Sequence, residues 1–254
     1  MEESVLYRTR NGVTTLVLNR PHVKNAVHGE MWAELSRALE RFEGSASERV
    51  LVITGAGDAF CAGADLSDLS DRSRSGLDRM REISAVSLSL HRLQKPTVAM
   101  VNGVAAGAGC NLALGCDLVV AGRSARFSEI FVKRALAVDF GGSYLLPRMV
   151  GLHRAKELAF FGDILSAAEA ESFGLVNRVV EDDALQGFVD AWAERLARSA
   201  STALSLTKTL LNDSFSLSME AALEREALAQ TIAMASPDAS EAIAAFREKR
   251  EPRY

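Results

Sequence analysis

Two glycine-rich segments of the sequence could offer backbone N–H groups to a ligand. The first segment, 61–66, contains Gly63-Ala64-Asp65 and comes shortly after the apolar run 50–54. The second segment, 103–109, follows the apolar run 97–101 and leads into a helical pattern. Small residues at the start of a helix leave N–H groups that suit a negatively charged oxygen. The same composition is also expected of a glycine-lined helix that only packs closely against a sheet.

Asp139 is the third candidate for chemistry. It stands in an otherwise apolar run, between Val138 and Phe140 and just before Gly141-Gly142. Apolar neighbours raise the pKa of a carboxyl group and make its ionised form a stronger base, so this side chain could take up and return a proton. The alternative is structural, because Asp is a common N-cap and could cap a helix that begins near Gly141.

Several other chemistries lack their motifs. The patterns GxSxG, HExxH and GxxxxGK[ST] are absent, which argues against a serine nucleophile elbow, a zinc protease and a phosphate-binding loop of that class. The dinucleotide pattern GxGxxG fails at both turns, because its sixth position is Phe60 counted from Gly55 and Leu112 counted from Gly107. The three cysteines and four histidines show no ligand spacing, so we expect neither a zinc site nor a disulfide framework.

Alternating strands and helices must position these segments. Short apolar runs separated by helical patterns fill about two thirds of the chain, and a helical pattern alone continues from 184 to 250, broken near 199–201, 213–218 and 236–237. This order predicts an α/β core over residues 1–195 and a helical region over 196–254. We expect strands at 5–9, 13–18, 50–54, 97–101, 117–121 and 175–180.

Composition narrows the possible partners. The chain has 254 residues, 48% of them hydrophobic, which is enough for a sizeable core. Its formal net charge of -4 gives no basic excess for nucleic acid. No run of about 18 apolar residues and no N-terminal apolar region is present, so we expect no membrane segment and a soluble, cytoplasmic protein.

The motifs occur together and in a recognisable order. On them the chain resembles the crotonase family, also called the enoyl-CoA hydratase/isomerase superfamily. The matching motifs are Asn19-Arg20-Pro21, Asn25-Ala26, 60–66, Lys95-Pro96, Val101-Asn102-Gly103, Gly107-Ala108-Gly109, Cys116-Asp117, Gly141-Gly142, Leu146-Pro147-Arg148, Ala170-Glu171, Gly174-Leu175-Val176, Glu241-Ala242 and 246–250.

The resemblance implies a fold, a ligand and an oligomer. The family fold is a spiral of ββα units whose C-terminal helices support a trimer, often paired into a hexamer. The family binds acyl-CoA thioesters, so coenzyme A enters as part of the substrate and no separate cofactor is expected. By motif position, the N–H groups of Ala64 and Ala108 hold the thioester oxygen as it becomes an enolate, and such donors are worth about 3–4 kcal/mol each.

The resemblance also implies a CoA site built from three segments. Its two lysines would meet phosphates as point charges, although a solvated surface charge is the alternative for each. The matching positions are Lys24 and Ala26 in the loop at the nucleotide end, Ala62, Asp65 and Leu66 in the adenine-side turn, and Phe246 and Lys249, which reach the CoA of a neighbouring subunit.

The chain departs from the hydratases of this family at both acid/base positions. Those enzymes use two glutamates, and the matching positions here are Asn111 and Phe131, while Glu129 is two residues out of register and is expected to point elsewhere. Asp139 instead matches a position used by certain isomerases, including dienoyl-CoA isomerases and the ring-epoxide isomerases of phenylacetate breakdown, and by aryl-CoA dehalogenases. The dehalogenases also use a His and a Trp, and both Trp32 and Trp192 lie far in sequence from the site motifs, which argues against dehalogenation.

These matches favour an enoyl-CoA isomerase in which Asp139 is the single acid/base. Three alternatives stay open: a hydratase of low activity that uses Glu129 or Asp139 with Asn111, an acyl-CoA-binding protein without catalysis, and a nucleotide-dependent oxidoreductase. We expect the loop 67–76 and the helix after it to set the depth of the acyl pocket.

Overall fold

The computed structural model describes residues 3–69 and 75–254, with the side chains of 68–69 left out. Residues 70–74 of the expected loop 67–76 therefore lie outside the described part. The beginning of that segment differs from the expected loop, because Leu66–Leu69 form the short helix α2. Asp65 stabilises the start of α2, because its carboxylate accepts hydrogen bonds from the backbone N–H and the hydroxyl of Ser67.

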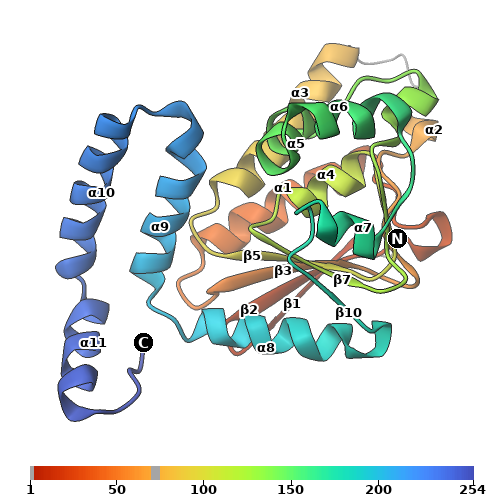
Figure 1. Cartoon of the computed structure of the whole chain (residues 1–254). Helices are drawn as coiled ribbons and strands as arrows, with labels where there is room; N and C mark the ends of the chain where they lie inside the picture. The colour runs from red at the N-terminus through yellow and green to blue at the C-terminus, as the bar shows by residue number, and fades with distance from the viewer. Residues whose placement is uncertain (1–2, 70–74) are drawn as a thin grey trace.

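A six-stranded sheet forms the centre of the molecule, in the order β1-β2-β3-β5-β7-β10 (Figure 1). β1 and β2 form an antiparallel hairpin whose turn is Asn11-Gly12, a dipeptide typical of such turns, and both of these residues have positive φ. Every other neighbouring pair in this sheet is parallel. The strands are β1 Val5–Arg10, β2 Val13–Leu18, β3 Val50–Gly55, β5 Thr97–Val101, β7 Leu118–Gly122 and β10 Arg178–Val180.

The expected strands are confirmed, and two of them begin later than expected. The strand expected at 117–121 begins one residue later, because the Asp117 carboxylate bonds the backbone N–H and hydroxyl of Thr97 at the start of the neighbouring strand. The strand expected at 175–180 is shortened to three residues. Gly174 has φ +81, and the side chains of Leu175 and Val176 are buried in the core before the strand begins.

A smaller four-stranded sheet, in the order β4-β6-β8-β9, carries the functional segments. Each of its first three strands comes soon after a long strand of the main sheet, and helical structure follows it. This repeat of long strand, short strand and helix is the spiral of ββα units that the sequence resemblance implies. The short strands are β4 Ala59–Cys61, β6 Val104–Ala106, β8 Arg126–Ser128 and β9 Leu165–Ser166.

Alternate residues of the central strands face two different cores. Leu51 and Ile53 join the larger core beneath α1 and α3, whereas Val50 and Val52 face the opposite side and pack with α8. Because side chains alternate across a strand, a strand covered on both sides reads as a continuous apolar run. The covering helices include α1 Gly29–Gly44, α3 Gly76–Arg92, α4 Ala108–Leu114, α5 Gly142–Val150, α6 Leu152–Phe161, α7 Ala167–Ser172 and α8 Leu185–Ala197.

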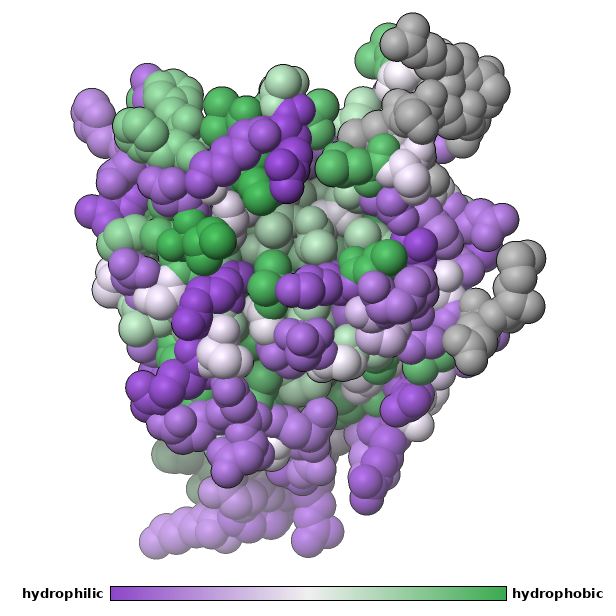
Figure 2. Space-filling model, turned by 90° about the vertical axis from the view of Figure 1, so that its right-hand side faces the viewer, coloured by the Kyte–Doolittle hydropathy of each residue, from purple (hydrophilic) through white to green (hydrophobic). Residues whose placement is uncertain are grey.

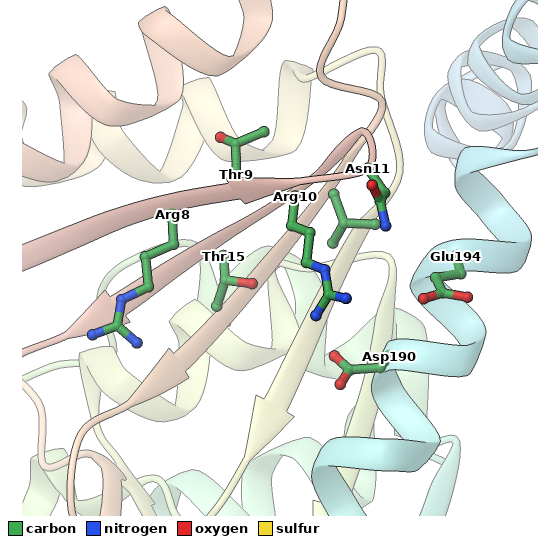
Figure 3. A pocket seen from close by; sticks show the side chains of 8 residues that line it. Arg8, Thr9, Arg10, Asn11, Thr15, Asp190 and Glu194 are labelled. Carbon is green, nitrogen blue, oxygen red and sulfur yellow. The ribbon is translucent and has the colours of Figure 1, made fainter.

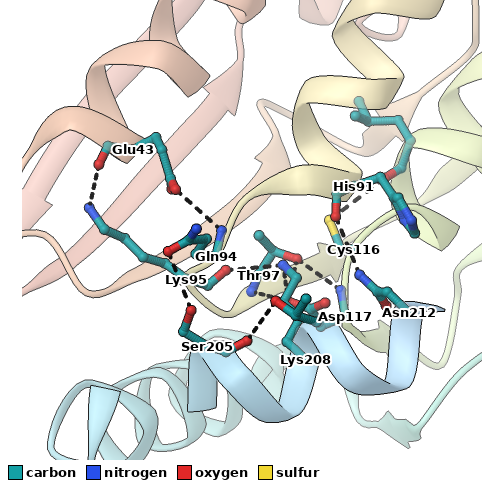
Figure 4. A network of polar contacts seen from close by, with 12 residues as sticks. Glu43, His91, Gln94, Lys95, Thr97, Cys116, Asp117, Ser205, Lys208 and Asn212 are labelled. Carbon is teal, nitrogen blue, oxygen red and sulfur yellow. Dashed lines mark hydrogen bonds and ion pairs between the residues drawn. The ribbon is translucent and has the colours of Figure 1, made fainter. Parts of the chain in front are cut away.

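Three C-terminal helices extend away from this core (Figure 1): α9 Ser201–Asp213, α10 Met219–Met234 and α11 Pro237–Glu248. A polar network ties α9 to the core (Figure 4). The ammonium group of Lys208 lies 2.8 Å from the Asp117 carboxylate and donates to the carbonyl oxygen of Lys95. The Lys95 ammonium in turn donates to the carbonyl oxygens of Phe42 and Glu43 in the last turn of α1 and to that of Ser45 just after it. Whether the segments 1–195 and 196–254 fold as separate units stays a prediction.

The C-terminal helices also expose many large apolar side chains. Only Ala229 and Ala245 are buried in α10 and α11. The exposed large side chains on these two helices are Met219, Leu223, Leu228, Ile232, Met234, Ile243 and Phe246. None of the helices in the described residues has the length and apolar character needed to cross a lipid bilayer.

Candidate active site

A mainly apolar pocket of about 490 Å³ lies between the two glycine-rich turns, α3 and the segment that contains Asp139. Met80 and Ile83 of α3 line it, in agreement with the expectation that this helix shapes the acyl pocket. Phe131 and Leu136 contribute further apolar surface. Figure 2 views the side of the molecule on which α2 lies, and a recess with hydrophobic residues is visible there between hydrophilic ones.

The first glycine-rich turn presents the N–H of Ala64. Ala64 pairs with Val27 in an isolated parallel bridge, in which the Val27 N–H donates to the Gly63 carbonyl and the Asp65 N–H donates to the Val27 carbonyl. These two hydrogen bonds involve the Gly63 carbonyl and the Asp65 N–H, which lie on either side of Ala64 in the chain. In the part of the chain that the structure describes, the Ala64 N–H itself has no acceptor. It is therefore free to donate to a ligand in the pocket that Ala64 lines.

The second turn presents the N–H of Ala108. Gly107 is the N-cap of α4 with φ +54, and Ala108 is the first helical residue, so its N–H has no acceptor within the helix. The two turns touch: a Cβ on Gly63 would lie 2.8 Å from the Ala106 carbonyl oxygen and 3.6 Å from the Ala108 nitrogen. A Cβ on Gly109 would lie 2.3 Å from the Cys61 carbonyl oxygen. Glycine at 63 and 109 thus lets the two donors share one wall of the pocket.

Asp139 also lines this pocket. Its Oδ1 is buried and has no partner among the described residues. Burial raises the pKa of this carboxyl from its ordinary 3.8 to about 6. The helix-capping alternative is wrong, because Gly141 is the N-cap of α5 and no side chain caps that helix.

The turn that carries Asp139 is held from three sides. Phe140 and Gly141 have φ values of 49° and 82°, a left-handed conformation that is costly for a phenylalanine. The buried Phe140 ring stacks on Trp32 at 5.1 Å, and its carbonyl accepts a hydrogen bond from Ser87 of α3. Trp32, distant in sequence, is thus brought beside the Asp139 turn, although it is not among the residues that line the pocket. The third hold is the side-chain amide of Asn111, which donates to the Asp139 carbonyl at 3.0 Å.

Glu129 lies behind the pocket rather than in it. Its side chain is buried, and its Oε2 accepts a hydrogen bond from Asn111 at 3.3 Å. Burial is the main reason that its pKa is raised from 4.5 to about 7, and the charge of Asp139 adds to the effect. Glu129 is absent from the pocket lining, which agrees with the expectation that it points elsewhere, but its register in the sequence does not indicate the contact with Asn111. The presence of a carboxylate inside the mostly apolar segment 127–131 is the feature of the sequence that could have indicated a buried role for Glu129.

The structure places four of the seven predicted CoA-site residues at the pocket: Ala26, Ala62, Asp65 and Leu66. Lys24 is exposed outside the pocket lining, and its carbonyl oxygen accepts the Ala62 N–H, which ties the loop to the turn. Phe246 and Lys249 of the α11 end do not line this pocket, and Phe246 is 84% exposed. Their contribution to a neighbouring subunit stays a prediction.

Arg20 is a residue of this site that the sequence analysis did not single out. Its guanidinium lies 2.9 Å from the Asp65 carboxylate and donates to the Ala26 carbonyl at 2.6 Å. Hydrogen bonds from Ser67 and Arg20 lower the pKa of Asp65 to about 2. The Asp65 carboxylate is therefore occupied in joining the two segments. The Asn19-Arg20-Pro21 motif was its signal in the sequence.

A second hollow lies on the other side of the main sheet, between the β1–β2 hairpin and α8 (Figure 3). The Arg8 and Arg10 side chains of the hairpin and the Asp190 and Glu194 carboxylates of α8 line it. These opposite charges complement one another across the hollow. Among the described residues, no three His, Cys, Asp or Glu side chains are grouped to hold a metal ion.

Comparison with known proteins agrees with this geometry. Residues 8–254 match the family model described as enoyl-CoA hydratase/isomerase. The chain is 39% identical to the 1,2-epoxyphenylacetyl-CoA isomerase of Escherichia coli K12, over 100% of this chain and 99% of that protein. It is 37% identical to a probable enoyl-CoA hydratase of Rhodobacter capsulatus, over 99% and 97% of the two chains.

Solved structures show the same fold. The crystal structure of an enoyl-CoA hydratase from Bacillus anthracis superposes with a TM-score of 0.95 at 31% identity, and the match covers 99% of each chain. Both the sequence and the fold therefore match along their whole length. The chain belongs to the enoyl-CoA hydratase/isomerase family of acyl-CoA enzymes.

Proposed function

We propose that this protein is an enoyl-CoA isomerase that moves a double bond within the acyl chain of a CoA thioester. One observation carries the proposal: Asp139 is the carboxyl group with a raised pKa among the residues that line the pocket, which also include Ala64 and Ala108. A single carboxylate is sufficient for a reaction in which one proton leaves and one returns. Coenzyme A is part of the substrate, so the reaction needs no separate cofactor.

The reaction would proceed through an enolate. With a pKa of about 6, Asp139 is mostly ionised at neutral pH and removes a proton from the carbon next to the thioester carbonyl. The negative charge moves to the thioester oxygen, where the N–H groups of Ala64 and Ala108 stabilise it. The protonated Asp139 then returns the proton at the far end of the conjugated system. No atom is gained or lost.

The name of the Escherichia coli relative supports an isomerase, whereas that of the Rhodobacter capsulatus relative supports a hydratase. Hydration is the second candidate, with Glu129 or Asp139 and Asn111 arranging the water. It is less well supported, because Glu129 is 3% exposed and is absent from the pocket lining.

A spectrophotometric assay with a 3-enoyl-CoA and a 2-enoyl-CoA tests this proposal. An isomerase generates the absorbance of the conjugated thioester from the 3-enoyl substrate. A hydratase instead removes that absorbance from the 2-enoyl substrate. If neither substrate reacts while acyl-CoA still binds in calorimetry, the proposed double-bond isomerisation is wrong for the acyl chains of these two substrates.

We also propose that the protein forms a homotrimer or a pair of trimers through its C-terminal helices. The exposed Leu228, Ile232 and Ile243 give α10 and α11 an apolar surface typical of an interface. We expect light scattering to give three or six times the chain mass of 27.4 kDa. Ile232→Glu should shift the protein to smaller species, while Glu224→Gln on the same helix should not. A wild-type mass of one chain would contradict this proposal.

A further inference from the structure

A cluster of buried polar groups lies behind the catalytic pocket and has no role in the reaction as written above. Its members are Asn111 of α4, which is fully buried, and Glu129, which is 3% exposed and lies between β8 and the short helix η2 Ile130–Arg134. The Cys110 thiol also hydrogen-bonds the Glu129 carboxyl. Burying a carboxyl group is costly, so this cluster requires an explanation in terms of what it holds in place.

Asn111 links this cluster to the turn that carries Asp139. Its Nδ2 has two hydrogens, and it donates to Glu129 Oε2 at 3.3 Å and to the Asp139 carbonyl oxygen at 3.0 Å. The same carbonyl accepts the Gly142 N–H, which closes the turn at the start of α5. The fit is tight, because a Cβ on Gly142 would lie 2.4 Å from Asn111 Nδ2. The Asn111 amide therefore lies between Glu129 and the Asp139 turn and is hydrogen-bonded to both.

Three oxygen atoms of the cluster and of Asp139 beside it lack a hydrogen-bond donor among the described residues. In the described part of the chain, Glu129 Oε1, Asn111 Oδ1 and Asp139 Oδ1 are buried without partners. Asp139 lines the pocket, so its carboxyl group can meet a substrate there. Glu129 and Asn111 are outside the pocket lining, so a ligand in the pocket would not supply a donor to their oxygen atoms. A proton on the Glu129 carboxyl would supply that donor and would remove the cost of a buried charge.

We propose that Glu129 is a positioning residue that acts in its protonated form: it fixes the amide of Asn111, and Asn111 fixes the turn that aims Asp139 into the pocket. This inference rests on the proposed isomerase function for its kinetic test only. It assigns Glu129 neither contact with the substrate nor a proton transfer. The bonds that form and break in the reaction are unchanged.

The proposal predicts a specific pH profile. The titratable groups that act on Glu129 are the Cys110 thiol and the Asp139 carboxylate. Lys133 and Arg134 of η2 and Asp163, which follows α6, are exposed, and Lys133 and Asp163 pair with each other. Asp139 titrates with a pKa of about 6 and Glu129 with a pKa of about 7. Activity should rise as Asp139 ionises and fall again as Glu129 ionises and adds a second negative charge beside the first.

Two variants separate a positioning role from a merely structural one. Glu129→Gln retains a neutral polar group, and we expect kcat to fall less than tenfold and the decline at high pH to disappear. Glu129→Met removes the partner of Asn111, and we expect kcat to fall roughly 10- to 100-fold with KM nearly constant, because the base is misplaced while the binding surface is intact. Melting curves establish that both variants fold.

Two outcomes would overturn the proposal. If Glu129→Gln loses as much activity as Asp139→Asn, then Glu129 takes part in proton transfer. If Glu129→Met retains the wild-type kcat and pH profile, then Glu129 does not position Asp139.

Infrared spectroscopy tests the protonated state without relying on turnover. At a pH below 7, the Asp139→Asn variant should show the C=O stretch of a protonated carboxyl group, and the double variant with Glu129→Gln should lack it. Removing the Asp139 charge lowers the Glu129 pKa somewhat, so the decisive spectrum is taken at about pH 5, where burial should keep Glu129 protonated. If the single variant lacks this band there, the protonated Glu129 is refuted whatever reaction the enzyme catalyses. If the band is present but the wild type does not act on a 3-enoyl-CoA, only the proposed reaction fails.

Discussion

Asp139→Asn should reduce the isomerisation of a 3-enoyl-CoA by about 10³-fold in kcat, because the amide cannot accept the proton that must leave the substrate. The side chain is nearly the same size, and Gly141 rather than Asp139 caps α5, so the helix start should be intact. KM should change little, because the variant retains the pocket wall and both N–H donors. Steady-state assays of the wild type and the variant measure this loss.

The stability of this variant provides the control. The pKa of Asp139 is raised from 3.8 to about 6 in the folded protein, so the folded state binds a proton more tightly than the unfolded state between these values. Stability therefore falls as pH rises through this window. Asn cannot ionise, so the variant should be more stable than the wild type at pH 7, by roughly 1 kcal/mol after allowing for solvent screening. This gain should vanish below about pH 4.

The same titration sets the acid side of the pH profile. Because only the ionised carboxylate accepts a proton, kcat/KM of the wild type should rise with pH and reach half its maximum near the pKa of about 6. Loss of stability without loss of activity in Asp139→Asn would show that another group is the base. A profile with no transition in this region would lead to the same conclusion.

Ala108→Pro should reduce kcat by about 10²- to 10³-fold, because it removes one of the two N–H groups proposed to stabilise the enolate. Ala108 is the first residue of α4, where proline costs a helix no hydrogen bond. Proline disfavours an α-helical backbone at the residue before it. Gly107 does not have an α-helical backbone (φ 54°, ψ -127°), so it can precede a proline. The fold should therefore tolerate this change.

Ala108→Gly is the matched control, because it retains the N–H and alters the side chain by one methyl group. We expect it to retain most of the activity. Binding of a saturated acyl-CoA, measured by calorimetry, separates the loss of a donor from a blocked pocket. If Ala108→Pro binds this ligand and turns over the 3-enoyl substrate at the wild-type rate, the Ala108 N–H has no part in the reaction.

Much of this protein was predictable from the sequence because the signals are local. The apolar run 50–54 between turn residues indicates a buried strand, since a strand covered on both faces has no polar side. Asn11-Gly12 specifies a hairpin because both residues tolerate positive φ. The helix α1 is equally readable from the sequence, because its apolar residues Met31, Leu35, Leu39 and Phe42 repeat with the helical period. Asp139 was identified as a candidate because a carboxylate in an apolar run is unusual.

Other features were decided only by the tertiary structure. The N–H groups of Ala64 and Ala108 lie 44 positions apart in the chain, and they meet because β4 and β6 are neighbours in one sheet and glycine at 63 and 109 allows the close approach. Trp32 reaches the Asp139 turn through the packing of α1. The contact of Glu129 with Asn111 depends on how β8 lies against α4. Such contacts join residues that are distant in sequence, and no local propensity or periodicity records which distant surfaces will pack together.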